Sequence, residues 1–344
     1  MPVVALVSFR LGGGDGVSIE AAKWGWALER LGFEVTTVAG VGPVDHLVPG
    51  LALDATEGPT EGEVAAALAD ADLVVVENLC SLPLNPAAAA VVATVLRGRP
   101  AVLHHHDLPW QRPQFAADHP VPTDPAWVHV TINDLSRAEL RARGIEAVTI
   151  RNAFDTDAAP GRRSVMRAAL DVDDGTRLFL HPSRAIARKD VPAAVALAEA
   201  LGATYWLLGP AEDGYDVDTV LGRATTPVLR GFPEGRWAVA DAYAASDAVV
   251  FPSTWEGFGN PTVESAVHRR PLAVGPYPVA AELARFGFRW FTSDDPAPLG
   301  RWLDAPDPGL LDHNREVARR HFSMDGLVTR LGAVLERSWW KTSL

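Results

Sequence analysis

The chain has 344 residues, of which 48% are hydrophobic and 22% charged, and its formal net charge at pH 7 is −12. This length suffices for two domains with separate cores, and the composition excludes a disordered or fibrous protein. The negative charge disfavours nucleic acid or an anionic bilayer as the main partner, because both are polyanions.

The number of cysteines and the absence of long apolar runs indicate the cellular compartment in which the protein is expected. The single cysteine, Cys80, excludes an intramolecular disulfide framework and any zinc site built from several thiolates. The first residues lack the charged region and cleavage site of a signal peptide, and no apolar run reaches the roughly 18 residues that a membrane span needs. We therefore expect a cytoplasmic protein without a transmembrane segment.

The chain opens with a β-α-β pattern. Residues 3–7 form a continuous apolar run typical of a buried parallel strand, residues 17–31 have helical periodicity, and residues 34–39 predict the next strand. The loop at 11–16 is rich in glycine, but the dinucleotide fingerprint counted from Gly12 has Val17 in place of its third glycine. The loop is therefore either a ligand-binding loop of another kind or a flexible turn.

Further apolar runs at 73–77, 101–104 and 128–132 predict successive strands. Three consecutive histidines, His104 to His106, end the second of these runs. Side chains of a strand alternate between its faces, so at best two of the three share a side, which disfavours a metal site. His106 and Asp107 follow the carboxyl end of a strand, where open α/β sheets bind ligands. A purely structural histidine remains the alternative.

A second domain follows a polar segment at 156–164, which we interpret as a linker. Its first apolar strand, near 177–181, leads into a loop that contains Arg184 and Lys189. Strands at 204–209 and 228–233, a helix at 191–201 and a short helix at 241–247 come next. The run at 248–251 is the last strand before a glycine-rich turn.

That turn carries two carboxylates, Glu256 and Glu264. Asn260 is a good N-cap and Pro261 suits the first helical position, so the amides of Thr262 and Val263 are expected to be free to bind an anion. Gly259 would let the backbone approach a ligand closely. Two acids beside a phosphate site suit a nucleotide-diphosphate sugar, and a plain capped strand-turn-helix is the alternative.

Glu256 and Glu264, with seven residues between them that include Gly-Phe-Gly-Asn-Pro, resemble the donor-site signature of retaining family 4 glycosyltransferases of the GT-B fold. Arg184 and Lys189 resemble the Arg-x4-Lys pair that holds the donor diphosphate in that family. The glycine loop, the His-Asp pair, an Asn-to-Asp segment at 152–155 and a final helix occur in the family's order. Ala153, Asp190 and the pair at 277–278 depart from glycines of the family pattern.

The resemblance implies an α/β protein with two doubly wound Rossmann-like domains facing a central cleft. The domains would be 1–157 on the acceptor side, 158–324 on the donor side, and a terminal helix, 325–344, that crosses back to the first domain. The implied reaction is retaining transfer of a hexose from a UDP- or GDP-sugar to a hydroxyl acceptor, a small soluble molecule or a glycan, without metal or cofactor. A nucleotide-sugar epimerase and a non-catalytic sugar- or nucleotide-binding protein are the alternatives.

The resemblance also implies roles for individual residues. The catalytic set is Glu256, His106, Arg184 and Lys189, with His106 reaching the transferred sugar. The donor is contacted by Gly13, Gly14, Arg184, Lys189, Gly231, Phe232, Glu256, Gly257, Phe258, Gly259, Asn260, Pro261, Thr262 and Glu264. The acceptor is contacted by Gly12, Asp15, Asp107 and Trp110. Nucleic acid is not an expected partner, peripheral membrane contact is not favoured, and the sequence leaves the oligomeric state, nucleobase, sugar and acceptor open.

Overall fold

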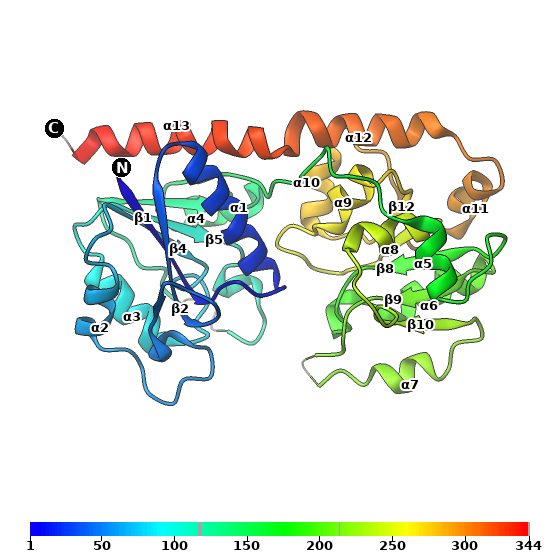
Figure 1. Cartoon of the computed structure of the whole chain (residues 1–344), viewed down its shortest axis with the longest axis horizontal. Coiled ribbons are helices and arrows are strands. Elements are labelled where there is room, and N and C mark those ends of the chain that lie inside the picture. The colour runs from blue at the N-terminus through cyan, green and yellow to red at the C-terminus, as the bar shows by residue number, and fades with distance from the viewer. Residues whose placement is uncertain (116–118, 213, 343–344) are drawn as a thin grey trace. The chain divides into compact units, whose positions relative to one another are not determined.

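The computed structural model describes residues 1–115, 119–212 and 214–342. The chain divides into two compact units (Figure 1). The first comprises Met1–Ala153 and the chain from Met324 onward, and the second comprises Phe154–Ser323. The sequence interpretation set the end of the first domain four residues later, at residue 157.

The first unit contains a seven-stranded sheet in the order β3-β2-β1-β4-β5-β6-β7, and every pair of neighbours is parallel. Every residue of the central strands β4 and β5 is buried, which explains their continuous apolar runs. The strands are β1 (Val3–Arg10), β2 (Glu34–Val41), β3 (His46–Leu47), β4 (Leu73–Glu77), β5 (Ala101–His105), β6 (Trp127–Thr131) and β7 (Ala147–Thr149).

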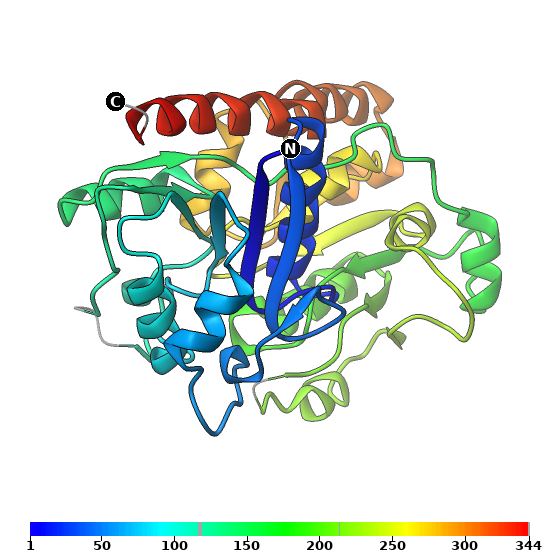
Figure 2. The ribbon, with the colours of Figure 1, turned by 60° about the vertical axis from the view of Figure 1, so that its left-hand side comes forward.

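Helices cover the sheet of the first unit. They are α1 (Gly16–Arg30), η1 (Pro49–Leu51), α2 (Glu61–Ala67), α3 (Pro86–Val95), η2 (Pro109–Gln111), α4 (Asp134–Ala142) and α13 (Met324–Thr342). Helix α13 lies against α1 (Figures 1 and 2), and its Leu327 and Leu331 join the same core as Trp24 and Leu28. The predicted terminal helix therefore packs on the first unit, and residues 343–344 of that prediction lie outside the described residues.

The second unit contains a six-stranded parallel sheet in the order β10-β9-β8-β11-β12-β13. Its strands are β8 (Leu178–His181), β9 (Thr204–Leu207), β10 (Val228–Arg230), β11 (Ala248–Phe251), β12 (Leu272–Val274) and β13 (Phe291–Thr292). Its helices are α5 (Arg163–Ala169), η3 (Ala187–Lys189), α6 (Val191–Ala200), α7 (Val217–Leu221), α8 (Val239–Ala245), α9 (Pro261–Val267), α10 (Pro278–Ala284), α11 (Pro296–Asp304) and α12 (Pro308–Phe322).

Each sheet has a point where the strand order reverses. In the first unit the chain runs from β1 to β2 on one side and returns to β4 on the other, and in the second unit β8 and β11 are related in the same way. Ligands of open parallel sheets bind at the carboxyl ends of the strands beside this reversal. The predicted fold class, two doubly wound Rossmann-like domains, is confirmed. In the described part of the chain, no helix is both long enough and apolar enough to cross a bilayer.

The packing of α13 generates a stability prediction. Replacing the fully buried Leu331 with Ala should lower the free energy of unfolding by about 3 kcal/mol, because it leaves a cavity between α13 and α1. Replacing the exposed Glu336 on the same helix with Ala is the matched control and should change it by less than about 0.5 kcal/mol. Urea unfolding measures the free energy of unfolding of both variants. Equal decreases in the two variants would contradict the described packing.

Candidate active site

The turn between β11 and α9 differs from its prediction at the helix start. Asn260 has helical dihedrals, φ −45° and ψ −40°, and its side chain does not cap α9. The amide of Thr262 donates to the Gly259 carbonyl at 2.9 Å, and that of Val263 to the Asn260 carbonyl at 3.0 Å. Asn260 occupies the N-cap position and Pro261 the first helical position, as predicted. The prediction that the amides of Thr262 and Val263 are free is wrong, because the turn itself consumes both donors.

Gly259 is required by packing within the unit. Its φ is +87°, a conformation that favours glycine, and a Cβ at this position would lie 2.0 Å from the Tyr277 hydroxyl. Tyr277 is 1% exposed, and its hydroxyl donates to the Phe258 carbonyl at 3.2 Å. The space that the sequence interpretation reserved for a ligand beside Gly259 is thus filled by Tyr277.

Glu256 pairs with two basic side chains in the second unit. Its carboxylate is 6% exposed and accepts from Lys189 Nζ at 2.5 Å on one oxygen, and Arg188 Nη1 lies 2.7 Å from the other. Burial opposes ionisation of Glu256, but the charges of Lys189 and Arg188 lower its pKa. Burial lowers the pKa of Lys189 to about 8, with Arg188 and Arg184 acting in the same direction and Glu256 opposing them.

Arg188 also ties two loops together. Its guanidinium donates to the Trp255 carbonyl at 2.8 Å, and its own carbonyl accepts from the Thr254 amide at 2.9 Å. The loop after β8 and the loop after β11 therefore hold each other beside the strand-order reversal.

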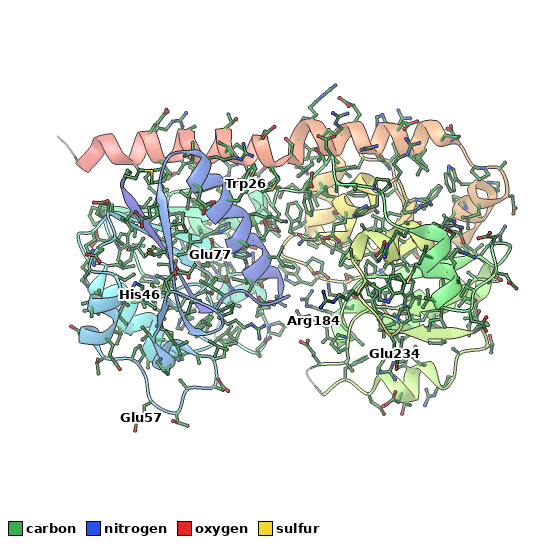
Figure 3. All side chains as sticks on the ribbon, in the orientation of Figure 1. Trp26, His46, Glu57, Glu77, Arg184 and Glu234 are labelled. Carbon is green, nitrogen blue, oxygen red and sulfur yellow. The ribbon has the colours of Figure 1, made fainter. Side chains whose placement is uncertain are left out.

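Arg184 lies on the same loop but is much more accessible. Its side chain, which Figure 3 labels, is 44% exposed, and it pairs with Glu212 at 2.5 Å. An exposed ion pair of this kind is weak, so a stronger anion could displace Glu212. Arg184 and Lys189, which the sequence paired by their spacing, both lie at the carboxyl end of β8.

Glu264 is held by a separate contact. The Tyr243 hydroxyl donates to its carboxylate at 2.7 Å, and the Tyr243 ring stacks on His268 at 4.8 Å. Burial and the charge of Glu264 raise the pKa of Tyr243 well above its usual range, so the phenol stays a donor. Glu264 thus keeps a fixed orientation in the first turn of α9.

The remaining predicted donor residues fall into two groups. Phe258, Pro261 and Thr262 have buried side chains, and Phe258 packs between Phe154 and Phe322. Only backbone atoms of these three could serve a ligand. Gly231 and Phe232 follow β10, where Phe232 is 38% exposed and contacts Trp206 edge-on, and Trp206 donates to the Gly231 carbonyl at 2.7 Å.

In the first unit, the glycine loop follows β1. Gly12 has a φ of +74° and packs closely on Pro43, whereas no atom lies within 4 Å of a Cβ built on Gly14. Asp15 caps α1 through the amides of Val17 and Ser18, both at 3.2 Å, and pairs with Arg10 at 3.0 Å. Asp15 therefore has a structural role that the acceptor interpretation did not include, and Gly13 lies next to its carboxylate.

The three histidines divide between the two faces of the sheet, as the strand pleat requires. His104 Nδ1 and His106 Nε2 both hydrogen-bond Glu77 Oε2, at 2.8 Å and 2.9 Å. His105 points the other way, to Ser81 at 2.7 Å and His129 at 2.9 Å. The nitrogen and oxygen atoms of the Glu77 group lie within 4.8 Å of one another. A metal ion there would have to displace both hydrogen bonds, and its absence remains an expectation.

The two predicted acceptor residues beyond the histidines are also engaged. Asp107 pairs with Arg112 at 2.6 Å. Trp110 donates from its indole nitrogen to Glu139 at 2.8 Å, and the Arg143 guanidinium lies over its ring at 3.6 Å. Both side chains lie on the segment that leaves β5.

Sequence reasoning missed four partners of the predicted residues: Glu77, Arg188, Glu212 and Tyr243. The sequence does contain a pattern that points to one of them, Glu77. Glu77 ends the strand before the histidines, and it lies directly beside His104 in the parallel register of β4 and β5. Consecutive strands of a parallel sheet are often neighbours, so the pairing could have been inferred.

Sequence comparisons relate the chain to two proteins of the same name. No family model matches the chain. The mannosylglucosylglycerate synthase of Thermotoga maritima is 25% identical, covering 94% of this chain and 97% of that protein. The protein of the same name from Petrotoga mobilis is 23% identical, covering 83% of this chain and 85% of that protein.

Solved structures resemble the chain over nearly its whole length. Anabaena HepE in complex with UDP-glucose has a TM-score of 0.74 at 17% identity, covering 97% of this chain and 99% of that one. The sucrose-phosphate synthase of Thermosynechococcus elongatus has a TM-score of 0.77 at 14% identity, covering 99% and 100%. The two Rossmann-like units have the GT-B fold.

The charge cluster around Glu256 generates the next prediction. Replacing Glu256 with Gln should lower the free energy of unfolding by about 3 kcal/mol, because Lys189 and Arg188 lose their shared counter-charge in a buried site. The same substitution at the exposed Glu212 should cost less than about 1 kcal/mol. Urea unfolding at pH 7 compares the two, and a loss at Glu256 no larger than at Glu212 would contradict the buried pairing.

Proposed function

We propose that the chain is a glycosyltransferase that moves a hexose from a nucleotide sugar, a UDP- or GDP-sugar, to a hydroxyl of a small sugar-containing acceptor. The names of both mannosylglucosylglycerate synthases, matched over most of their length, support sugar transfer, and the HepE complex supports a nucleotide sugar as donor. The observation that carries the proposal is the group Arg184, Lys189 and Glu256 beside the reversal of strand order in the second unit.

In this proposal the second unit binds the donor. Arg184 and Lys189 neutralise the diphosphate, and their fixed charges stabilise the negative charge that grows on the leaving group. Each must exchange a carboxylate for phosphate: Arg184 leaves Glu212 and Lys189 leaves Glu256. Because the amides of Thr262 and Val263 are occupied, the two cations carry more of the phosphate binding than the sequence interpretation assigned them. The proposal requires no metal ion.

The two glutamates act at opposite ends of the donor. Glu264, oriented by Tyr243, accepts hydrogen bonds from the ribose hydroxyls. Glu256 orients hydroxyls of the transferred hexose and remains held by Arg188 when Lys189 turns to the phosphate. Gly231 and Phe232 lie at the end of β10, a position suited to the nucleobase. The other proposed donor contacts are Gly13, Gly14, Gly257, Phe258 and Asn260. Gly259, Pro261 and Thr262 are withdrawn, because Tyr277 fills the space beside Gly259, Pro261 has no amide hydrogen and is buried, and the turn uses the Thr262 amide.

The first unit binds the acceptor in this proposal. Asp107 follows β5, and Gly12 and Asp15 follow β1, so these residues extend from the carboxyl edge of one sheet, and His106, also after β5, is placed to reach the transferred hexose. Trp110 offers a partly exposed indole face of the kind on which sugar rings rest. The relatives' name contains mannose, glucose and glycerate, which makes glucosylglycerate the first acceptor to test.

The transfer retains the configuration at the anomeric carbon, as in family 4. The bond from the anomeric carbon to the diphosphate oxygen breaks, and a bond from the acceptor oxygen to the same carbon forms on the same face. The acceptor proton passes to the leaving diphosphate oxygen. Exclusion of water from the reacting carbon prevents hydrolysis of the oxocarbenium-like centre.

The direct test is incubation of the protein with a panel of UDP- and GDP-hexoses, with and without glucosylglycerate. Release of nucleoside diphosphate only with acceptor, together with a new α-linked or β-linked product of unchanged anomeric configuration, is the expected result. An altered nucleotide sugar without acceptor would identify an epimerase instead. Binding of a nucleotide sugar that is never consumed would identify a non-catalytic binding protein.

The role of Arg184 predicts a selective loss. Replacing Arg184 with Ala should reduce kcat/KM for the donor about a hundredfold, because one fixed charge at the diphosphate is lost. Arg177 is the matched control: it also pairs with one carboxylate, Asp304, but lies before β8 at the opposite edge of the sheet. Its replacement with Ala should leave kcat/KM within about twofold. Equal losses from the two variants would remove Arg184 from the site.

The lowered pKa of Lys189 predicts a pH dependence. The ammonium is charged below about pH 8 and neutral above it, so the KM for the donor should rise as pH passes upward through about 8. Replacing Lys189 with Arg, which stays charged, should flatten KM across this window. Initial rates at several donor concentrations measure both profiles, and an identical rise in the variant would assign the titration to another group.

A further inference from the structure

A buried group of charged side chains lies under α1 in the first unit, at the carboxyl ends of β4 and β5. Glu77 is 0% exposed, His104 1%, His106 6% and Glu20 1% (Figure 3 labels Glu77). Lys23 pairs with Glu20 at 2.5 Å. Groups of this kind are rarely buried unless they are paired, so the distribution of charge among them decides what the cluster can do.

Glu77 is the acceptor at the centre of the cluster. One of its oxygens, Oε2, receives hydrogen bonds from both His104 Nδ1 and His106 Nε2. Each of these ring nitrogens must therefore carry a proton, because an ionised carboxylate can only accept. His104 Nδ1 and His106 Nε2 are therefore protonated. The protonation of the other two nitrogens, His104 Nε2 and His106 Nδ1, depends on their surroundings.

The cluster needs one more positive charge. Glu20 has Lys23 as its counter-ion, whereas no lysine or arginine pairs with Glu77 among the described residues. A buried carboxylate without a counter-charge is strongly unfavourable. Burial raises the pKa of Glu77, but the charges and hydrogen bonds of His104 and His106 lower it below its usual range, so the carboxylate is ionised. Charge balance around an ionised Glu77 then requires one of the two histidines to be an imidazolium.

The surroundings of the two rings decide which one. His104 lies flat against Trp24, with ring centroids 4.1 Å apart, and its Nε2 is a buried atom without a hydrogen-bond partner among the described residues. A second N–H on His104 would thus be buried and unsatisfied. His106 Nδ1 is not such an atom, and the residual exposure of His106 leaves it open to water or a ligand.

We propose that His106 is an imidazolium fixed by Glu77, and that its Nδ1–H is a charged hydrogen-bond donor for an oxyanion of the substrate, a carboxylate or a phosphate oxygen. Glu77 is then a positioning residue. His106 cannot act as a general base in this state, since neither nitrogen has a free lone pair. The bound group is an oxyanion in place of the sugar hydroxyl that the family resemblance implied. Only the ligand part rests on the proposed function.

The neighbouring charges agree with this assignment. Burial alone would lower the pKa of His106, but the hydrogen bond and charge of Glu77, and the charges of Glu20 and Asp107, raise it. Burial lowers the pKa of His104 and the charge of His106 lowers it further, against the opposing effect of Glu77. A raised pKa extends the pH range in which the His106 ring keeps its charge beyond that of a histidine in water, and the charge is lost as pH rises through the raised pKa.

Nuclear magnetic resonance of the histidine rings tests the charge without any turnover. The whole chain is labelled with ¹⁵N at histidine, and the His106 signals are assigned by their loss in His106→Gln. We expect both His106 nitrogens to be protonated at pH 7 in the unaltered protein, and Nδ1 to lose its proton at that pH in Glu77→Gln. Ser81→Ala, which alters the contact of His105 on the opposite face, is the control and should leave His106 unchanged.

If Glu77→Gln does not fold, the protonation of His106 at pH 7 in the unaltered protein still tests the assignment. A neutral His106 at pH 7, or one that stays charged in folded Glu77→Gln, overturns the assignment.

Addition of D-glycerate, inorganic pyrophosphate or glycerol to the labelled protein tests the ligand. A shift of the His106 signals with glycerate alone identifies an acceptor carboxylate, and a shift with pyrophosphate alone identifies a donor phosphate. Equal shifts with the uncharged glycerol, or no shift with any of the three, contradict an oxyanion site. If no nucleotide sugar is ever consumed, the proposed function fails, but the charge measurement still stands by itself.

Discussion

A carboxylate taken out of water must be met by positive charge and by hydrogen-bond donors, and this constraint organises both units. Glu256 in the second unit lies between Lys189 and Arg188, and Glu77 in the first lies between His104 and His106. Each carboxylate sits at the carboxyl edge of a parallel sheet beside the reversal of strand order. In the proposed function Lys189 turns from Glu256 to the donor phosphate while Arg188 keeps Glu256 paired, which links stability to binding.

In the proposed function, the cations of the second unit contribute more to phosphate binding than the helix start does. The first turn of α9 uses its own amides, through the Gly259 and Asn260 carbonyls, so it offers little to an anion. Arg184 and Lys189 are instead paired with Glu212 and Glu256. A diphosphate that takes over both cations would leave Arg188 as the counter-ion that keeps Glu256 oriented.

Sequence reasoning reached the fold and the general position of the candidate site. Continuous apolar runs such as 73–77 and 248–251 indicated buried parallel strands, and residues after such strands necessarily gather at one sheet edge. What it could not reach were contacts that depend on exact backbone dihedrals and on strand neighbours. The helix begins where the sequence predicted, but its first amides bond to the Gly259 and Asn260 carbonyls, and Tyr277 fills the space at Gly259 from a distant segment. The partner Tyr243 became visible only when the side-chain directions were known, whereas Glu77 could have been inferred from the order of consecutive strands.

The most direct test of this account is a crystal structure of the protein with a bound UDP- or GDP-hexose. We expect the diphosphate within hydrogen-bond distance of Arg184 and Lys189, with Glu212 displaced and Glu256 still paired with Arg188. A nucleotide bound elsewhere, or a diphosphate bound while Lys189 remains on Glu256 and Arg184 on Glu212, would contradict it.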